Sequence, residues 1–306
     1  MSDIKVKFRG VRGSFPVADR SFLQFGGNTS CVEIKIKDET IILDAGTGIV
    51  SAGNDMMEEN ISSSPIVENR EPIKTNILIS HIHQDHLLGL AFFKPLHLKT
   101  SNIRIFGSTF VDVNMKEALS TLVFGKTFPI ELGEIACKLD IQDIDNAKGI
   151  IIKPKCDAQL IFDEEIHPDE EDILITFYKS YVHPKDGVMI YKISYKNKSV
   201  VYATDKECYM GGDKKFAKFA KNCDILIHDS QYTAEDYLNP YSPKQGFGHS
   251  TFDMAIEAMK QTEAKNLVFF HYEPSYDDAK LSAIKERYAS EYKNVYMSYE
   301  GFELEI

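Results

Sequence analysis

Cysteine is scarce in this sequence, and no pair of cysteines has the spacing of a metal-binding motif. The five cysteines are odd in number and scattered, without any C-x-x-C: Cys31, Cys137, Cys156, Cys208 and Cys223. This pattern argues against both a disulfide framework and a zinc ribbon. We therefore expect each cysteine to be a small buried hydrophobic side chain, in a protein of the reducing cytoplasm.

Positive charge and long apolar segments are also lacking. Asp and Glu total 46 against 35 Lys and Arg, so the formal net charge is −11. A negative surface does not attract nucleic acid over long range, which makes nucleic acid an unexpected partner unless a local basic patch exists. No apolar run approaches the ~18 residues that span a bilayer, and no signal sequence is visible, so we expect no membrane partner.

Hydrophobic patterning predicts a mixture of strands and helices in both halves of the chain. Strands are expected where residues alternate or form short apolar runs: 5–8, 31–36, 40–43, 75–80, 188–195, 199–203, 224–227, 267–270 and 295–306. Helical spacing and caps predict helices over 112–124, 213–221, 251–263 and 277–291. The polar segment 58–72 and the acidic segment 163–172 are expected to be loops. Two similar halves favour an α/β fold of stacked sheets with helices outside, a four-layer αββα sandwich.

The strongest motif is the run from His81 to His86, which reads His-Ile-His-Gln-Asp-His and follows a short buried strand. Three imidazoles and the carboxylate of Asp85 lie within these six residues. On a strand, His81 and His83 would point to the same side, because side chains alternate. Asp85 and His86 would then begin the next turn, so one short loop can aim ligands at two metal ions. Imidazole and carboxylate together suit zinc, manganese or iron.

This motif resembles the His-x-His-x-Asp-His signature of the metallo-β-lactamase superfamily, and later motifs of that family follow in order. They are Tyr181-Val182-His183-Pro184, Tyr202-Ala203-Thr204-Asp205 and Phe270-His271-Tyr272-Glu273-Pro274. The resemblance covers nearly the whole chain and implies the αββα sandwich as a single domain over residues 1–306. It also implies a metal-dependent hydrolase with two divalent ions, with Zn²⁺ expected and Mn²⁺ or Fe as alternatives.

Carried over residue by residue, the resemblance implies seven ligands. The first ion takes His81, His83 and His183, the second takes Asp85, His86 and His271, and Asp205 bridges both. Two metal ions generate a nucleophile from water at neutral pH and stabilise an oxyanion, so the implied chemistry is hydrolysis, with Asp85 counted among the catalytic residues. Asp44 and Asp229 would lie near the site, either orienting ligands or simply ending strands.

His249, in Gly248-His249-Ser250-Thr251, is not needed to complete the ligand set. Ribonuclease Z and cyclic phosphodiesterases of the superfamily have a similar His-Ser-Thr motif at the start of the helix before the last ligand strand. That resemblance implies a catalytic histidine that stabilises a phosphoryl oxygen or protonates the leaving alkoxide. The alternative is a histidine at the start of a helix, with Ser250 or Thr251 as its cap.

Two further regions bear on the branch of the superfamily. The openings Arg9-Gly10-Val11-Arg12-Gly13-Ser14 and Gly26-Gly27-Asn28-Thr29-Ser30 resemble a phosphodiesterase-like branch, in which glycines let the backbone approach the metal centre and Arg12 or Asn28 could contact a phosphate. Ribonuclease Z inserts a long arm for transfer RNA between the positions of His183 and Asp205. Only 21 residues separate these two positions here, which is enough for a hairpin.

The leading hypothesis is a phosphodiesterase that acts on a small-molecule phosphodiester, such as a cyclic nucleotide or a cyclic sugar phosphate. The alternatives are an acyl hydrolase (a thioesterase, lactonase or β-lactamase-like enzyme), a ribonuclease, and a metal-binding regulatory module without turnover. His249 distinguishes the phosphodiesterase from the acyl hydrolase, because acyl hydrolysis does not require a histidine at this position. Relatives of this type are often dimers, so a homodimer is expected.

Overall fold

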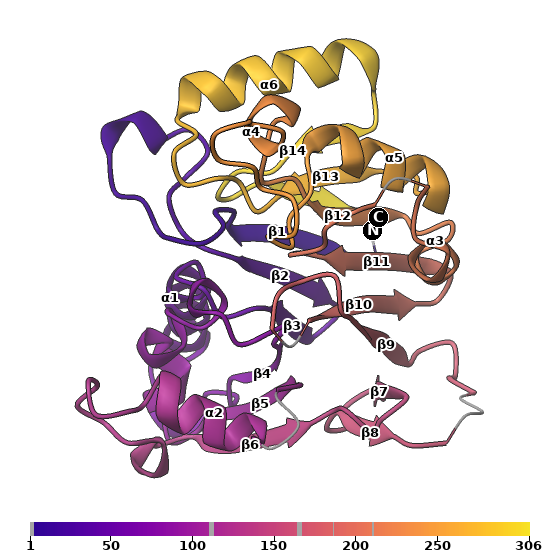
Figure 1. Ribbon diagram of the computed structural model, residues 1–306. Coiled ribbons are helices and arrows are strands. Elements are labelled where there is room, and N and C mark those ends of the chain that lie inside the picture. The colour runs from indigo at the N-terminus through magenta and orange to yellow at the C-terminus, as the bar shows by residue number, and fades with distance from the viewer. Residues whose placement is uncertain (1–2, 110–112, 164–166, 186, 210) are drawn as a thin grey trace.

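Two β-sheets lie face to face in this chain, and helices cover the outer face of each sheet (Figure 1). In this view, α4, α5 and α6 lie on one side of the sheets, and α1 and α2 lie on the other. The structure is a computed structural model that describes residues 3–109, 113–163, 167–185, 187–209 and 211–306. The predicted α/β class and the four-layer αββα order are confirmed.

The first sheet combines strands from the first half of the chain with its last strand. Its seven strands follow the order β15 (Glu303–Glu305), β1 (Lys5–Gly10), β2 (Cys31–Ile36), β3 (Glu39–Leu43), β4 (Lys74–Leu78), β5 (Asn102–Gly107) and β6 (Lys138–Asp143). Neighbours from β15 to β3 are antiparallel, whereas β3, β4, β5 and β6 run parallel. In β1 and β2, Val6 pairs with Ile34, so the alternating apolar residues share one buried face.

The second sheet is built from strands that lie between residues 149 and 297. Its eight strands follow the order β14 (Val295–Met297), β13 (Leu267–Phe270), β12 (Ile225–Asp229), β11 (Lys198–Ala203), β10 (Val188–Tyr195), β9 (Ile173–Ser180), β7 (Gly149–Ile152) and β8 (Gln159–Ile161). The strands β11 to β14 are parallel, and β10 and β11 form an antiparallel hairpin. The parallel parts of both sheets are the parts that end at the candidate site.

Every described helix except α1 follows a residue whose side chain caps its first turn. The helices are α1 (Ile49–Ser63), α2 (Met115–Leu122), α3 (Lys214–Phe219), α4 (Ala234–Tyr237), α5 (Phe252–Thr262) and α6 (Asp278–Glu291), with short 3-10 turns at Arg20–Phe22, Val67–Asn69, Gln84–His86, Leu90–Phe92, Lys94–His97 and Leu132–Glu134. Thr251 caps α5 by accepting a hydrogen bond from Met254 N, as expected from the sequence. Asp277 caps α6 in the same way through Lys280 N.

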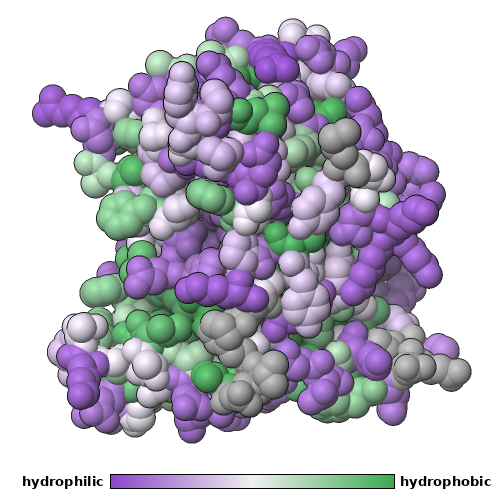
Figure 2. Space-filling model, in the orientation of Figure 1, coloured by the Kyte–Doolittle hydropathy of each residue, from purple (hydrophilic) through white to green (hydrophobic). Residues whose placement is uncertain are grey.

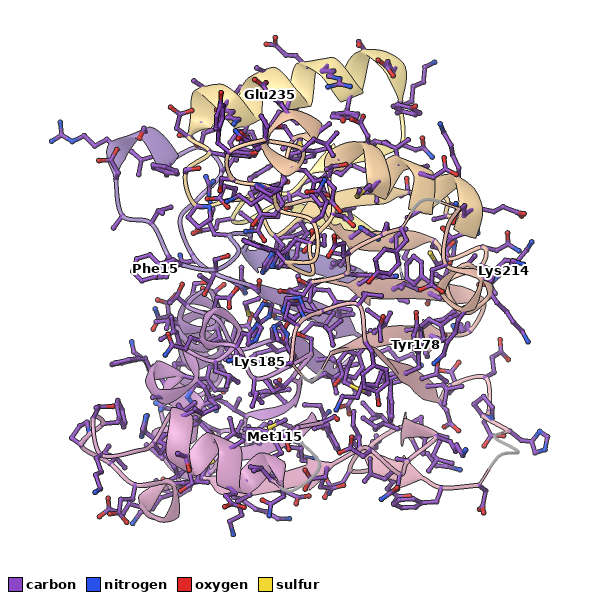
Figure 3. All side chains as sticks on the ribbon, in the orientation of Figure 1. Phe15, Met115, Tyr178, Lys185, Lys214 and Glu235 are labelled. Atoms are coloured by element: carbon purple, nitrogen blue, oxygen red, sulfur yellow. The ribbon has the colours of Figure 1, made fainter. Side chains whose placement is uncertain are left out.

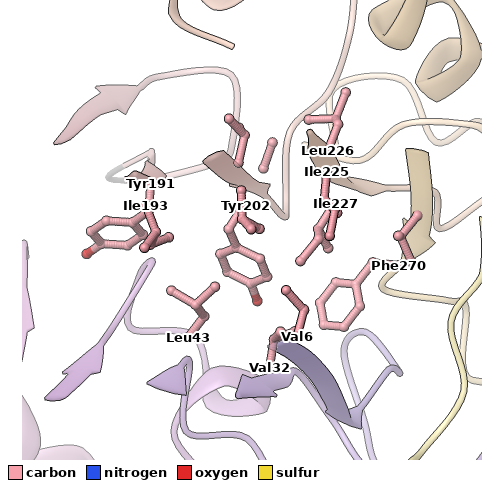
Figure 4. Packing of buried hydrophobic residues seen from close by; sticks show 14 of the residues in the cluster. Val6, Val32, Leu43, Tyr191, Ile193, Tyr202, Ile225, Leu226, Ile227 and Phe270 are labelled. Carbon is pink, nitrogen blue, oxygen red and sulfur yellow. The ribbon is translucent and has the colours of Figure 1, made fainter. Parts of the chain in front are cut away.

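The space between the sheets is filled by one large hydrophobic cluster. Figure 4 shows Val32 and Leu43 of the first sheet facing Tyr202 and Phe270 of the second. A second cluster lies under α1 and α2, on the outer face of the first sheet. Because Tyr202 has a hydroxyl, its burial requires a polar partner, and that partner belongs to the candidate site described below.

Several local predictions were wrong or incomplete. The segment 58–72, predicted as a loop, begins inside α1, whose buried residues Ile49, Ala52 and Met56 all lie in its first half. The polar second half of α1 is exposed, which removed the hydrophobic periodicity that would have marked a helix. Residue 112 of the predicted helix 112–124 and residues 164–166 of the acidic segment 163–172 lie outside the described residues.

The cysteines and the termini complete the description of the fold. Cys31, Cys137 and Cys223 are buried as predicted, but Cys156 is exposed and Cys208 is partly exposed. The ends of the chain lie together, because Asp3 N donates to Ile306 O and β1 pairs with β15 (Figure 1). Among the described residues, no helix is long and apolar enough to cross a bilayer.

Candidate metal centre

The candidate ligands follow the carboxyl ends of strands in both sheets. The run from His81 to His86 follows β4, Asp205 follows β11, and His271 follows β13. His183 lies in the connection between β9 and β10. Since the carboxyl ends of parallel strands lie at the same edge of a sheet, two such edges placed face to face bring these distant side chains together. His81 and His83 converge from a loop, because β4 ends at Leu78, and not from a strand as predicted.

The side chains form two groups of three. His81, His83 and His183 offer three nitrogen atoms that all lie within 4.8 Å of one another. Asp85, His86 and His271 form a second group within the same limit, in which Asp85 Oδ2 lies 3.2 Å from His86 Nε2 and 3.1 Å from His271 Nε2. These are the two sets that the sequence motifs paired.

Asp205 lies between the two groups and turns one carboxylate oxygen toward each. Its Oδ1 is 3.7 Å from His81 Nε2 and 3.7 Å from His183 Nε2. Its Oδ2 is 3.2 Å from His86 Nε2 and 3.3 Å from His271 Nε2. This is the arrangement that a carboxylate needs to bridge two ions.

Three residues of the site have the left-handed backbone conformation that non-glycine residues rarely adopt. The φ angles are 62° at Asp44, 51° at Asp205 and 67° at His271. Each of the three residues lies one or two positions after the end of a strand. Such conformations cost on the order of 1–3 kcal/mol and persist where the surroundings hold them. Here the turn away from the strand redirects each side chain across the sheet edge toward the site.

Asp44 holds one of the histidines in a defined orientation. Its Oδ2 accepts hydrogen bonds from His86 Nδ1 at 2.7 Å, from Ser80 Oγ at 2.7 Å and from Tyr202 OH at 2.8 Å. A proton on Nδ1 of His86 leaves Nε2, the atom that faces Asp85 and Asp205, free to bind a metal ion. The structure therefore gives Asp44 the position expected of an orienting carboxylate.

Asp229 holds His249 in a similar way. Asp229 Oδ2 lies 2.7 Å from His249 Nδ1, and Oδ1 accepts from Ser250 N at 2.8 Å. The His249 ring stacks on His271 with centroids 5.0 Å apart and meets the His183 ring edge-on at 5.1 Å. His249 thus touches one histidine from each group.

The pKa values place His81, His183 and Asp205 in their ligand forms, whereas the carboxylates of Asp85, Asp205 and Asp44 outweigh burial and raise the pKa of His86 well above its usual value. Burial lowers the pKa of His81 well below its usual value and that of His183 to about 4, so both rings are neutral. Burial alone would raise the pKa of Asp205, but the imidazoles of His271, His86 and His81 bring it well below its usual value. Burial alone would lower the pKa of His249, but the Asp229 carboxylate outweighs it and raises this pKa to about 9.

The donor set fits divalent metal ions. His81 Nε2 and His86 Nε2 are buried and have no hydrogen-bond partner among the described residues. A buried polar atom without a partner is costly, and a metal ion would provide one. Nitrogen and carboxylate donors suit zinc, manganese and iron alike, so the donor set alone does not distinguish these metals.

Comparison with known proteins agrees with this geometry. The profile of the β-lactamase superfamily domain matches residues 39–272, which is more than half of the 306 residues. The chain belongs to the metallo-β-lactamase superfamily. The ribonuclease Z of Picrophilus torridus is 25% identical to it over 328 aligned residues, covering 100% of this chain and 96% of the relative. The ribonuclease Z of Pyrococcus abyssi is 26% identical over 302 residues, covering 89% and 87%.

Solved structures show the same superfamily fold. The metallo-β-lactamase fold protein YhfI from Bacillus subtilis superposes with a TM-score of 0.62 at 19% identity, covering 99% of each chain. A diphosphatase from the PhnP family superposes with a TM-score of 0.60 at 15% identity, covering 99% of this chain and 98% of the other. The expectation of a metal-dependent hydrolase of this superfamily, with divalent metal ions, is confirmed at that level.

The amino-terminal opening lies at the site, but not in the way predicted for Arg12. Gly13 lies so close to His271 that an added Cβ would be 2.4 Å from the ring, and Ser14 N donates to Asp85 Oδ2 at 2.7 Å. Arg12 is fully buried, and its guanidinium donates to the carbonyls of Gly26 and Tyr276. The prediction that Arg12 contacts a phosphate is wrong, because a buried guanidinium inside the fold cannot reach substrate.

Asn28 is also occupied within the fold. Its side chain donates to Glu300 Oε2 at 2.9 Å, and its backbone N–H donates to the other oxygen of the same carboxylate.

Sequence reasoning did not assign a role to Ser80, Tyr202 or Thr204. Ser80 and Tyr202 both donate to Asp44, and Thr204 Oγ1 donates to Asp205 Oδ2 at 2.6 Å. Their places inside the ligand motifs were the only available signal.

Proposed function

We propose that residues 1–306 form one catalytic domain that holds two divalent metal ions, with Zn²⁺ expected, and hydrolyses a small-molecule phosphodiester. His81, His83 and His183 would hold the first ion, Asp85, His86 and His271 the second, and Asp205 would bridge both. Such ions would supply a nucleophile from water at neutral pH and electrostatic stabilisation of the developing oxyanion. The carboxylate of Asp205, facing both groups, supports this assignment.

The position of His249 is the observation that carries the phosphodiester assignment. Its Nδ1 is held by Asp229, so Nε2 is the ring atom left to face a substrate at the edge of the ligand cluster. The negative charge of Asp229 favours a protonated ring, which can donate to a phosphoryl oxygen or to the leaving alkoxide. A thioester expels a thiolate, which departs without a proton, so a proton donor at this position favours the phosphodiester over the thioester.

A cavity beside the first group supports a small anionic substrate. Its volume is about 330 Å³, and His81 and His83 contribute to its wall together with Ile82 and the ammonium-bearing Lys179 and Lys185. This volume lies near the lower end of the range for small-molecule sites. Lys185 lies near the middle of the molecule in Figure 3, and Figure 2 shows hydrophilic and hydrophobic residues mixed over this face.

Ribonuclease activity is the second candidate, because the ribonuclease Z relatives align along nearly their whole length. Against it, the described part of the 21 residues between His183 and Asp205 holds the β10–β11 hairpin and short connections. The net charge of −11 also disfavours long-range attraction of RNA. A small phosphodiester therefore remains the first choice.

A substrate panel with zinc-loaded and manganese-loaded protein tests this function. The panel contains cyclic nucleotides, a cyclic sugar phosphate, an aryl phosphodiester, a precursor transfer RNA, a thioester and a lactone. We expect the highest kcat/KM on one of the small phosphodiesters. The highest kcat/KM on the thioester or the lactone would overturn the assignment, and the highest on the precursor RNA would replace it with the second candidate.

A further inference from the structure

A cysteine and a histidine outside the candidate metal centre lie in contact with each other. Cys208 Sγ is 3.5 Å from His228 Nε2, which is within hydrogen-bond distance for sulfur. Cys208 follows β11 at a distance of three residues from Asp205, and His228 lies in β12. The reaction proposed above uses neither side chain, so their contact requires a separate explanation.

The tautomer of His228 follows from its second contact. Its Nδ1 lies 2.7 Å from the backbone oxygen of Asp229, and a carbonyl oxygen can only accept a hydrogen bond. Nδ1 therefore carries a proton, and in the neutral ring Nε2 presents a lone pair to the Cys208 thiol. This is the geometry in which an imidazole takes the proton of a thiol and leaves a thiolate beside an imidazolium.

The surrounding charges favour that ion pair. Lys206 is fully buried, with Nζ 2.9 Å from Asp213 Oδ2. Burial raises the pKa of Cys208, but His228 and Lys206 outweigh it and hold that pKa below its usual value. Burial and the charge of Lys206 lower the pKa of His228, but Cys208 outweighs both and holds that pKa above its usual value. The hydroxyl of Tyr178, labelled in Figure 3, lies in the same region and has no partner among the described residues.

Cys208 lines a cavity between α3 and α5. Its volume is about 570 Å³, and its wall includes Cys208, Phe216 and Met254. Three carboxylates, Asp213, Asp253 and Glu257, also line it. A negative lining repels anionic reagents and admits small uncharged ones. The cavity therefore selects the chemical class of reagent that can reach the thiol.

We propose that Cys208, paired with His228, is a reactive thiol that small uncharged electrophiles modify, and that hydroperoxides are its natural reagents. The thiolate sulfur attacks one peroxide oxygen, an S–O bond forms, and the O–O bond breaks. The leaving hydroxide of hydrogen peroxide, or the alkoxide of an organic hydroperoxide, takes the proton of the His228 imidazolium and departs as water or an alcohol. The sulfur is oxidised to a sulfenic acid and the peroxide is reduced, so electrons and protons balance.

Alkylation by iodoacetamide, an uncharged electrophile, tests the ion pair in the metal-loaded protein. The rates at Cys208 are measured by peptide mass spectrometry at pH 6.5 and pH 8.5. An ordinary thiol with a pKa of about 8.5 reacts about fifty-fold faster at the higher pH, because its thiolate fraction rises by that factor. We expect a ratio below about tenfold at Cys208. A ratio near fifty-fold would overturn the proposal.

The variant His228→Gln isolates the partner, since glutamine can still donate to the Asp229 carbonyl. We expect its Cys208 ratio to return to that of an ordinary thiol, and a ratio unchanged from wild type would contradict the pairing. If this variant does not fold, the wild-type ratio decides alone.

Hydrogen peroxide followed by dimedone tests the oxidation step. We expect sulfenic acid at Cys208 before the exposed Cys156, with no label at position 208 in Cys208→Ser. Labelling of Cys156 alone would contradict the assignment.

Discussion

The two halves of the chain contribute to the candidate metal centre in different ways. The first half supplies four ligands from one loop, His81 to His86, directly after β4. The second half supplies His183, Asp205 and His271 one at a time, from connections that are tens of residues apart. A local motif is thus visible in the sequence by itself, whereas the dispersed residues acquire meaning only when parallel strands bring their ends to one edge. We expect substitutions to show that the dispersed half is as necessary as the local one.

The largest effect is expected at Asp205, the dispersed residue that faces both groups. Asp205→Ala should lose both metal ions and essentially all hydrolysis, because the bridge and the charge that balances the ions disappear together. Elemental analysis and a phosphodiester assay measure the two losses. Asp205→Asn is the matched control for backbone strain, since asparagine also tolerates a φ of 51°. Retention of two ions and near-normal turnover in either variant would show that the bridge is wrongly assigned.

The next largest effect is expected at His249, a dispersed residue outside the ligand set. His249→Ala should keep its metal ions and lose roughly 10²–10⁴-fold in kcat, the usual range for a positioned acid or base. The loss should be smaller with an activated phenol leaving group, which departs without a proton. An equal loss on both substrates would indicate charge stabilisation instead of proton donation. Unchanged kcat on every phosphodiester would return His249 to a structural role at the start of α5.

A smaller effect is expected at Asp44, which supports the local loop from another strand. Asp44→Asn removes the charge that orients His86 and should weaken metal binding by roughly 10–100-fold. Competition with a chelator measures the affinity. Tyr202→Phe, which removes only one of the donors to Asp44, is the matched control and should have a smaller effect. Unchanged affinity in Asp44→Asn would show that the loop orients its own histidines.

The smallest effect on turnover is expected at Arg12. This residue belongs to the amino-terminal motif beside the site, but its guanidinium binds carbonyls inside the fold. Arg12→Met leaves the carbonyls of Gly26 and Tyr276 without a donor and should lower the free energy of unfolding by about 1–3 kcal/mol. Urea unfolding measures this, and kcat of the folded variant should remain unchanged. Wild-type stability with a large loss of kcat would restore Arg12 as a substrate contact.

Much of the fold could be predicted from the sequence, because its signals were local. The strands β10 and β13 were predicted with the bounds observed, and α5 and α6 within one residue at each end. Helix α1 was missed because its exposed second half is polar on all sides, so the stripe of apolar residues stops after Met56. The periodic signal of a helix is weak where the helix leaves the core, as α1 does after Met56.

The candidate site could be predicted where histidines and aspartates cluster in recognisable motifs. The ligand motifs and Asp44 were found in advance, but the roles of Ser80 and Tyr202 were not, because a buried hydroxyl has no distinctive sequence signal. Arg12 was misassigned for a related reason. A guanidinium that binds phosphate and one that binds buried carbonyls look the same in a sequence, and only the packing around Gly26 and Tyr276 separates them.

The number of metal ions per chain is the most direct test of the proposed centre. Protein loaded with zinc and freed of excess metal should contain two ions per chain by elemental analysis. Anomalous diffraction from its crystals should then place one ion among His81, His83 and His183 and the other among Asp85, His86 and His271, with Asp205 touching both. A tight stoichiometry of one, with Asp85 and His271 bound to no metal, would contradict the two-metal centre.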